Sequence, residues 1–378
     1  MTSSLNTPGS TVLLFEHAAA GGRIVAEARL NAPATLNALS LDMIDILDPA
    51  LRRWQDDERV VAVVVSGAGE RAFSAGGDIQ ALYRAMVRNH QAGERIDDYP
   101  YDFFEREYRL DYLLHVYRKP VLALGHGVIM GGGLGIFSAA AYRLVSEKMR
   151  IAMPEVTVGL FPDAGATWLL RGFPPHHALF LGMTGSHING ADALALGLGT
   201  HSVAKAAFDT LIDSLCELHF SGVPERDAGL VDAHLKTLPA ADQPEVQLPL
   251  IPDTLRIDVE LADAVVAMQA LEGRHPWLDR GLAAMSAGCP TTVGIVLEQL
   301  KRAHALQLAD CFRMEMTVAT HCADNHDFAE GVRALLIDKD NKPVWQFGDL
   351  ASLPDAHVQS HFLEPWLRNP LHDLEQTS

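Results

Sequence analysis

Cysteine and basic residues are scarce in this chain. Its 378 residues include four cysteines, and 30 Lys and Arg stand against 48 Asp and Glu, which gives a formal net charge of −18. The cysteines, Cys216, Cys289, Cys311 and Cys322, show no Cys-x-x-Cys spacing, so we expect free thiols in a reducing compartment. The acidic balance argues against a nucleic-acid partner, because sequence-independent binding needs Lys and Arg along a phosphate track.

Long apolar runs are also missing, as is a basic N-terminal segment. No apolar run approaches the length of a bilayer span, so no membrane partner is expected. The opening MTSSLNTPGS contains no basic residue, and the first arginine is Arg23, so neither a secretory signal nor an Arg-rich transit peptide is predicted. We therefore expect a cytoplasmic protein.

The first half of the chain alternates strand and helix patterns. The run VVAVVVS (60–66) is rich in β-branched residues, as is typical of a strand buried on both faces. Residues 11–30 predict two strands joined by a glycine pair, and residues 120–124 predict another strand. Apolar residues at helical spacing over 41–54 predict a helix, which Pro49 should kink or split. This alternation predicts an α/β fold.

Beyond about residue 168 the strand signal fades and helical patterns dominate. Helices are predicted over 257–272, 290–305 and 307–323. A polar, proline-containing break at 239–252 separates them from the first half. We therefore predict a catalytic core over residues 1–238 and a helical region over residues 253–378 that packs back on the core.

Two carboxylates stand in an otherwise apolar segment that is interrupted by Pro and Gly, MPEVTVGLFPDAGAT (153–167). Burying the charges of Glu155 and Asp163 among Val, Leu and Phe is costly unless each charge is paired or hydrogen-bonded. Upstream, MGGGLG (130–135) is a backbone with almost no side chains that can aim amide N–H groups at a ligand. Amide donors and two carboxylates are the groups needed for chemistry on a carbonyl. The simpler alternative is that Glu155 and Asp163 only cap local helices, with Asp163 at the start of the helix that begins just after it.

Six motifs resemble, in this order, those of the crotonase (enoyl-CoA hydratase/isomerase) superfamily. They are NAL (37–39), AFSAGGDI (72–79), FFEREY (103–108), KPVLALGHGVIMGGGLG (119–135), MPEVTVGLFPDAGAT (153–167) and HDFAEGVRALLIDKD (326–340). The similarity extends from residue 12 to residue 345, which is nearly the whole chain. It implies a crotonase-like superhelix of ββα units, here with an extended helical C-terminal region.

The resemblance also implies which residues bind an acyl-CoA. Members of the superfamily hold the thioester oxygen with two backbone amides, and these match Gly77 and Gly132 here, which would form an oxyanion hole. Glu107 matches a residue that contacts the substrate, although an ion pair with the arginines beside it is an alternative. The other substrate-binding positions that the resemblance implies are Ala75, Gly76, Asp78 and Gly131.

Position 135 separates two branches of the superfamily. The hydratases that this chain resembles use two glutamates, at the positions of Glu155 and Gly135, so the pair is broken here. The hydrolase branch has the arrangement found here, with Asp163 where hydratases carry a glycine. The resemblance therefore implies a catalytic Glu155 and Asp163 and hydrolysis of a 3-hydroxyacyl-CoA, with 3-hydroxyisobutyryl-CoA of valine breakdown as the favoured thioester. An enoyl-CoA hydratase or isomerase and a non-catalytic acyl-CoA-binding protein are the alternatives.

Coenzyme A would enter as part of the substrate, so no separate cofactor is expected. The segment GAGERA (67–72) fits a dinucleotide-binding pattern, but no second strand ending in an acid follows it. Ser74 lies in a segment that fails the GxSxG pattern of a nucleophilic serine. His321, Cys322 and His326 lack the companion residues of a metal motif, so no metal site is expected.

Two details stay open at this point. Ala166 stands where many hydrolases of this type carry a glycine, and its methyl group could reshape the acyl pocket. Relatives often assemble as trimers or hexamers, but the C-terminal extension could cover that interface. A homo-oligomer is therefore an open alternative.

Overall fold

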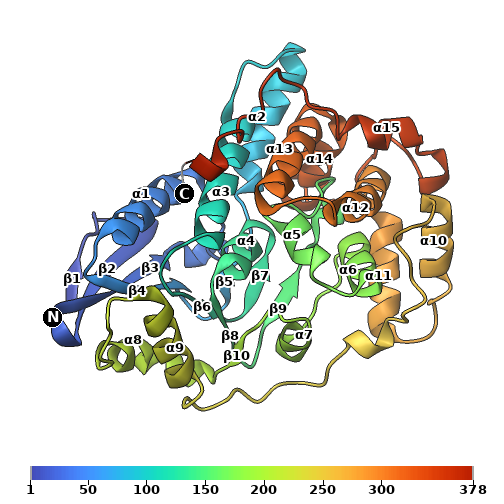
Figure 1. The fold of residues 1–378 in the computed structure, drawn as a ribbon. Coiled ribbons are helices and arrows are strands. Elements are labelled where there is room, and N and C mark those ends of the chain that lie inside the picture. The colour runs from blue at the N-terminus through green and yellow to red at the C-terminus, as the bar shows by residue number, and fades with distance from the viewer. Residues whose placement is uncertain (1, 377–378) are drawn as a thin grey trace.

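The larger of two β-sheets lies at one end of the molecule, in the computed structural model that describes residues 2–376 (Figure 1). Its strands lie in the order β1–β2–β3–β4–β6–β8–β10. They are β1 (Thr2–Ser4), β2 (Val12–Ala19), β3 (Arg23–Leu30), β4 (Val60–Gly67), β6 (Val121–Gly125), β8 (Tyr142–Val145) and β10 (His201–Ser202). The pairs β1–β2 and β2–β3 are antiparallel, and every later neighbouring pair is parallel. The predicted strands at 11–30, 60–66 and 120–124 are confirmed.

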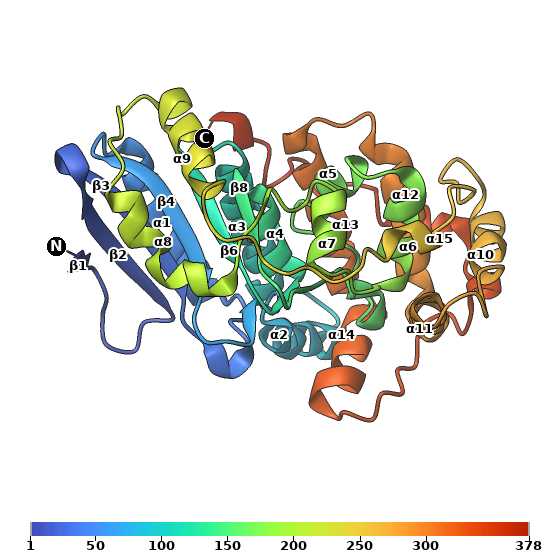
Figure 2. The same ribbon diagram turned by 90° about the horizontal axis from the view of Figure 1, so that it is seen from below.

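Helices cover both faces of this sheet. One face packs on α1 (Leu41–Asp56), α3 (Tyr99–His115) and α4 (Gly131–Ala139), and the other packs on α8 (Phe208–Cys216) and α9 (Pro224–Leu235). Figure 2 looks onto α8 and α9, which lie across the strands. Along β6, Leu122 and Leu124 belong to the apolar cluster under α8 and α9, whereas Val121 and Ala123 belong to the main core. The predicted α/β fold is confirmed.

A second sheet consists of three short parallel strands in the order β5–β7–β9. They are β5 (Ala72–Ser74), β7 (Val128–Met130) and β9 (Arg150–Ala152). The carboxyl ends of parallel strands meet at the same edge of a sheet, which is where open α/β sheets place their ligands. The glycine-rich segments after β5 and β7 and the Met-Pro-Glu segment after β9 therefore leave this sheet on one side.

The C-terminal half is mainly helical and reaches the end of the molecule opposite the larger sheet, as Figures 1 and 2 both show. The remaining helices are α2 (Ile79–Ala92), α5 (Ala166–Arg171), α6 (Pro175–Thr184), α7 (Gly190–Ala195), α10 (Leu261–Gln269), α11 (Pro276–Ala287), α12 (Pro290–Ala303), α13 (Leu308–Asp324), α14 (His326–Val332), α15 (Asp355–Ser360) and a π-helix at Arg333–Ile337. Helix α13 packs on α3 and α12 packs on α6, within one apolar cluster that also includes α1. The domain boundary at 239–252 stays a prediction.

Of the two outcomes predicted for Pro49, the split is wrong, because α1 is one continuous element from Leu41 to Asp56. The buried side chains of this helix, among them Leu47 and Trp54, stabilise it against the roughly 3 kcal/mol that an interior proline costs. The triple glycine Gly131–Gly133 forms the first turn of α4.

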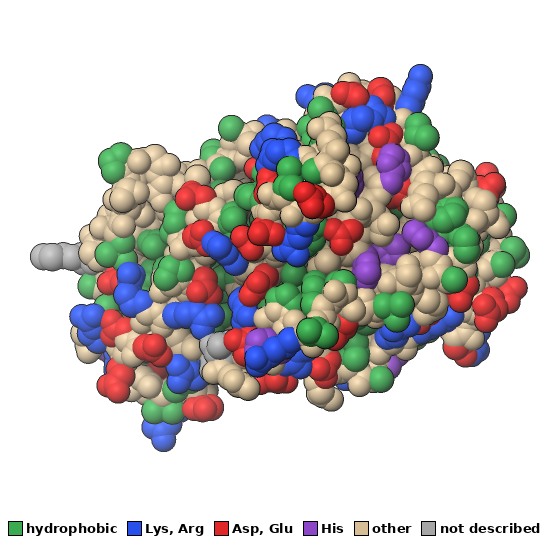
Figure 3. All heavy atoms as spheres, turned by 90° about the horizontal axis from the view of Figure 1, so that it is seen from above, with side chains coloured by type: hydrophobic (Ala, Val, Ile, Leu, Met, Phe, Trp, Pro, Cys, Tyr) green, Lys and Arg blue, Asp and Glu red, His purple; other side chains and the backbone are tan. Residues whose placement is uncertain are grey.

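The surface carries charges of both signs. Figure 3 shows one face on which Lys and Arg side chains lie among Asp and Glu side chains rather than in a continuous basic track. Within residues 2–376, no single helix is long and apolar enough to cross a membrane, and the pair α11 and α12 meets those criteria only jointly, across a bend of 111°.

Candidate active site

Three segments converge on a cavity at the carboxyl edge of the three-stranded sheet. Ala75–Gly77 follows β5, Gly131–Gly133 follows β7, and Met153–Glu155 follows β9. The first two segments touch, because a side chain on Gly131 would begin only 3.4 Å from the Cα of Gly76. These two glycines also have φ angles of +46° and +104°, which side chains rarely tolerate. Close approach and backbone conformation together therefore require glycine here.

The cavity has a volume of about 290 Å³ and a mainly apolar wall that includes Phe103, Phe104 and Leu336. It brings together nearly all of the predicted site residues: Ala75, Gly76, Gly77, Glu107, Gly131, Gly132, Glu155 and Asp163. The exception is Asp78, whose carboxylate accepts a hydrogen bond from the amide of Ala81 and so caps α2. The arrangement gives an apolar pocket with a few polar groups, as is usual for small-molecule sites.

Two backbone amides in the cavity wall are left out of the surrounding hydrogen-bond pattern. Gly77 forms a β-bridge with Leu39, but the bonds of this bridge use the carbonyl of Gly76 and the amide of Asp78. Gly132 lies in the first turn of α4, where amides have no acceptor within the helix. Both amides are therefore free of backbone partners in their own elements and can donate to a ligand oxygen.

Glu155 begins a single turn of 3-10 helix directly after β9 and is only 5% exposed. Its Oε1 atom faces the glycine loop, 3.4 Å from the point where a side chain on Gly131 would begin. Its Oε2 atom has no hydrogen-bond partner within residues 2–376. Burial, and then the charge of Asp163, raise the pKa of Glu155 well above its ordinary value. A raised pKa makes this carboxyl group a stronger general base than a free glutamate.

Asp163 lies in the loop between that turn and α5, where it faces α3. The hydroxyl of Tyr108 donates a 2.7 Å hydrogen bond to its Oδ2 atom. Burial raises the pKa of Asp163 to about 6, although the bond from Tyr108 lowers it. Helix α5 begins at an N-cap Gly165 without a capping side chain, so the alternative in which Asp163 only caps that helix is wrong.

Glu107 is buried and projects from α3 toward α4. Its Oε1 atom occupies the space that a side chain on Gly132 would need, 1.9 Å from the point where that side chain would begin. The ion-pair alternative for Glu107 is wrong, because Arg106 pairs with Asp45 and Arg109 pairs with Glu105 on the outside of the helix. Burial, followed by the charge of Asp163, raises the pKa of Glu107 well above its ordinary value.

The sequence analysis missed Asp111, which lies one helical turn beyond Glu107. This side chain is fully buried, and neither of its oxygens has a hydrogen-bond partner in the described part of the chain. Its Oδ2 atom lies 2.8 Å from the point where a side chain on Gly135 would begin. Burial, and then the charges of Asp163 and Glu315, raise the pKa of Asp111. Each of these charges therefore favours the uncharged form of the neighbouring acids.

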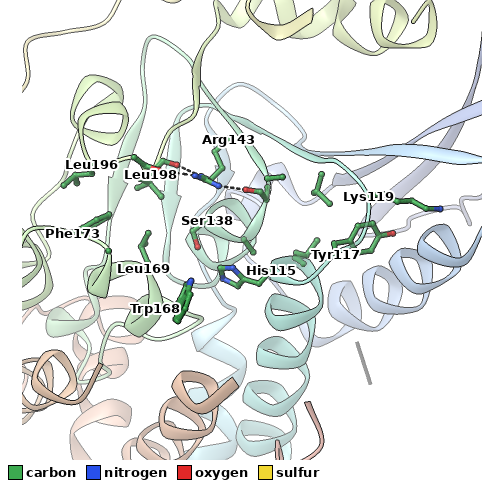
Figure 4. Close-up of a pocket in the computed structure, with 17 residues that line it drawn as sticks. His115, Tyr117, Lys119, Ser138, Arg143, Trp168, Leu169, Phe173, Leu196 and Leu198 are labelled. Atoms are coloured by element: carbon green, nitrogen blue, oxygen red, sulfur yellow. Dashed lines mark hydrogen bonds between the residues drawn. The ribbon is translucent and has the colours of Figure 1, made fainter. Parts of the chain in front are cut away.

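A second cavity of about 470 Å³ lies where the ends of α3, α4 and α5 meet (Figure 4). None of the predicted site residues lines it. Arg143 donates to three backbone carbonyls, and Lys119 donates to two more, so both cations already have partners. Burial lowers the pKa of His115 to about 4, which leaves its ring uncharged at neutral pH. This cavity therefore lacks the paired carboxylates of the first.

The other motifs considered from the sequence have structural partners. The Ser74 hydroxyl is fully buried and donates to the carbonyl of Asn37. The ring nitrogens of His321 and His326 bond to backbone carbonyls. Across the described residues, no group of three or more His, Cys, Asp and Glu side chains is placed to hold a metal ion.

Comparison with known proteins identifies the family. Residues 25–362 match a family model described as enoyl-CoA hydratase/isomerase. The chain belongs to this family. It is 34% identical to the mitochondrial 3-hydroxyisobutyryl-CoA hydrolase of Gallus gallus, over 88% of this chain and 85% of that protein. It is also 34% identical to the hydrolase of the same name from Danio rerio, over 95% of this chain and 91% of that protein.

Solved structures of the family confirm the predicted crotonase-like fold. A carnitinyl-CoA dehydratase from Mycobacterium thermoresistibile matches with a TM-score of 0.82 and 29% identity, over 97% of this chain and 99% of that one. An enoyl-CoA hydratase from Rhodobacter sphaeroides matches with a TM-score of 0.80 and 31% identity, over 94% of this chain and 98% of that one. The curated hydrolases are named as mitochondrial proteins, so they do not support the cytoplasmic location expected from the sequence.

Proposed function

We propose that this enzyme hydrolyses the thioester of a 3-hydroxyacyl-CoA, with 3-hydroxyisobutyryl-CoA as its favoured substrate. The observation that carries the proposal is that Glu155 and Asp163 line one cavity, while the position of Gly135 is closed to a further acid. The relatives named 3-hydroxyisobutyryl-CoA hydrolase support both the reaction and the acyl group. The small volume of the cavity suits a short acyl chain.

In the proposed reaction, the amides of Gly77 and Gly132 donate hydrogen bonds to the thioester oxygen. They stabilise the negative charge that develops there, and losing one such donor typically costs about 10²–10³ in rate. Glu155 either takes a proton from the attacking water or attacks the carbonyl carbon itself, giving a mixed anhydride that water then cleaves. Asp163 orients the 3-hydroxyl group of the substrate or relays the proton.

The products follow from either route. The carbon–sulfur bond breaks and the thiolate of CoA takes up a proton. The oxygen of water remains in the carboxylic acid when water attacks the acyl carbon, and it remains in Glu155 when water attacks the Glu155 carbon of the anhydride. Coenzyme A enters as part of the substrate and leaves as the free thiol, and we propose that no metal ion or further cofactor takes part.

Hydration of an enoyl-CoA is the alternative, and the names of the two solved structures favour it. The hydratases that the chain resembles need a second glutamate at position 135. A side chain at Gly135 would begin 2.8 Å from both the carbonyl oxygen of Ala164 and the Oδ2 atom of Asp111. Since that space is filled by backbone and by another acid, hydrolysis fits the site better.

The decisive experiment supplies purified protein with 3-hydroxyisobutyryl-CoA and with crotonyl-CoA in parallel. Free thiol and the absorbance of the crotonyl double bond are followed over time. Rapid thiol release from the hydroxy ester, with the crotonyl double bond unchanged, is the expected result. Loss of the double bond without thiol release would replace the proposal with hydration, and binding of both esters without either reaction would indicate a non-catalytic protein.

A further inference from the structure

The loop that carries Asp163 has an unusual backbone. Ala164 has a φ angle of +53° although it is not a glycine, and Gly165 follows with +84°. A left-handed conformation at a residue with a side chain is unfavourable and persists only where the surroundings impose it. Contacts from the surrounding structure must therefore hold this loop in place.

Glu315 of helix α13 holds the loop on its C-terminal side. Its Oε2 atom accepts a 2.8 Å hydrogen bond from the amide of Gly165, and its Oε1 atom accepts a 2.8 Å bond from the amide of Thr167. The side chain is fully buried. Both carboxyl oxygens are thus used to fix the backbone two and four residues after Asp163.

Gln299 of helix α12 holds the other side. Its side-chain amide donates 2.7 Å hydrogen bonds to the carbonyl of Pro162 and to the hydroxyl of Thr167. Gln299 is also fully buried. The backbone is therefore fixed immediately before Asp163 as well as after it.

We propose that Glu315 and Gln299 are positioning residues, which act on the reaction by holding the Asp163 carboxylate in place on the cavity. The inference rests on the proposed function, because it gives Asp163 a role in turnover. Neither residue lines the cavity, and neither has a hydrogen bond to the Asp163 side chain. The helical C-terminal region thus completes the site through the backbone of one loop.

The main competing explanation is that these bonds serve only the stability of the fold. The two explanations differ in how variants combine, because a group that acts only through Asp163 has no effect on turnover once that carboxylate is removed. Four proteins are needed: the wild type, Glu315→Gln, Asp163→Asn and the double variant. For each, kcat and KM for 3-hydroxyisobutyryl-CoA are measured with the melting temperature.

Glu315→Gln replaces one acceptor oxygen with an NH₂ group that faces an amide donor. We expect kcat to fall about 10- to 100-fold, as small misplacements of reacting groups do, while KM stays within about threefold. In the Asp163→Asn background the same change should lower kcat no further. An equal loss in both backgrounds would overturn the positioning role and leave the proposed function intact.

Two further variants provide a control and a substitute for Glu315→Gln. Thr320→Val is the matched control, because Thr320 is a buried polar residue of the same helix with no hydrogen-bond partner within residues 2–376, and kcat should not change. Gln299→Met removes both donors at similar size, and it takes the place of Glu315→Gln in the same cycle if that variant does not fold. Full turnover by Asp163→Asn alone would overturn the proposed role of Asp163, and with it this inference.

Discussion

The Oδ2 atom of Asp111 lies 2.8 Å from the point at which a side chain on Gly135 would begin. Helix α3 thus places a carboxyl group beside position 135 of α4. The hydratases that this chain resembles carry a glutamate at this position. The carbonyl oxygen of Ala164 lies at the same distance from that point. Position 135 is therefore closed by two different elements, and simple substitution should not convert this enzyme into a hydratase.

The first prediction concerns Gly135→Glu. We expect it to destabilise the fold by about 1–3 kcal/mol or more, because the new side chain meets backbone that cannot move aside. We also expect no hydration of crotonyl-CoA. Thermal unfolding and the absorbance of the double bond provide the measurements. Gly229→Glu is the control, since that helical glycine has open space around it and should be tolerated; a Gly135→Glu protein as stable as this control would contradict the steric argument.

The second prediction concerns the hydrogen bond from Tyr108 to Asp163. That bond lowers the pKa of Asp163, which burial has raised to about 6. If the ionised form is needed, kcat falls in acid with a midpoint near pH 6, and Tyr108→Phe moves this midpoint to higher pH. Turnover should therefore drop severalfold near pH 6.5 and recover at higher pH. Tyr117→Phe, which loses only a bond to a backbone carbonyl, should leave the profile unchanged.

The third prediction concerns Glu155. Glu155→Gln keeps the shape of the side chain but removes its ability to accept a proton or attack a carbonyl carbon, so kcat should fall by about 10²–10⁴. The dissociation constant for the substrate, measured by calorimetry, should change little. Glu298→Gln, which alters a partly exposed ion pair with Arg302, provides the control. Turnover retained by Glu155→Gln would remove Glu155 from the mechanism.

The fourth prediction concerns stability and pH. Burial raises the pKa of Glu315 from 4.5 to about 8, despite the opposing hydrogen bonds from Gly165 and Thr167. The folded protein thus holds this proton more tightly than the unfolded chain, so the contribution of Glu315 to the free energy of unfolding declines as pH rises from about 4.5 to about 8. Each pKa unit corresponds to about 1.4 kcal/mol.

Glu315→Gln removes that titration, so its unfolding free energy should depend less on pH over the same interval. Urea unfolding of both proteins at several pH values measures the two slopes. Parallel curves for the variant and the wild type would show that Glu315 has a similar pKa in the folded and unfolded states.

Much of the site could be predicted because most of its residues lie in short local motifs. The segments after β5, β7 and β9 each carry a local motif, and parallel pairing of these short strands brings the motifs to one edge. Asp111 also left a local signal, since Glu107, Asp111 and His115 recur at helical spacing in a helix whose other residues are largely apolar. The resemblance to known motifs pointed to Glu107 but not to Asp111.

Glu315 and Gln299 left no such signal. Each is a single polar residue in a helix, and their partners in the Asp163 loop lie between 132 and 150 positions earlier in the chain. Nothing local distinguishes a glutamate that accepts two distant amides from one that faces solvent. The prediction of a split at Pro49 failed for a related reason, because the packing that stabilises α1 is tertiary and its strength is not encoded in the helix itself.

The dependence of the Asp163 loop on helix α13 has a consequence for the timing of protein synthesis. A ribosome makes Glu155 and Asp163 well before it reaches Glu315. Glu315 lies 150 positions beyond Gly165, whose amide donates a hydrogen bond to it. Until α13 has emerged, the nascent protein contains both carboxylates, but the Asp163 loop lacks its hydrogen bonds to Glu315. Under the proposed positioning role of Glu315, full turnover begins only after the residues of α13 have left the ribosome.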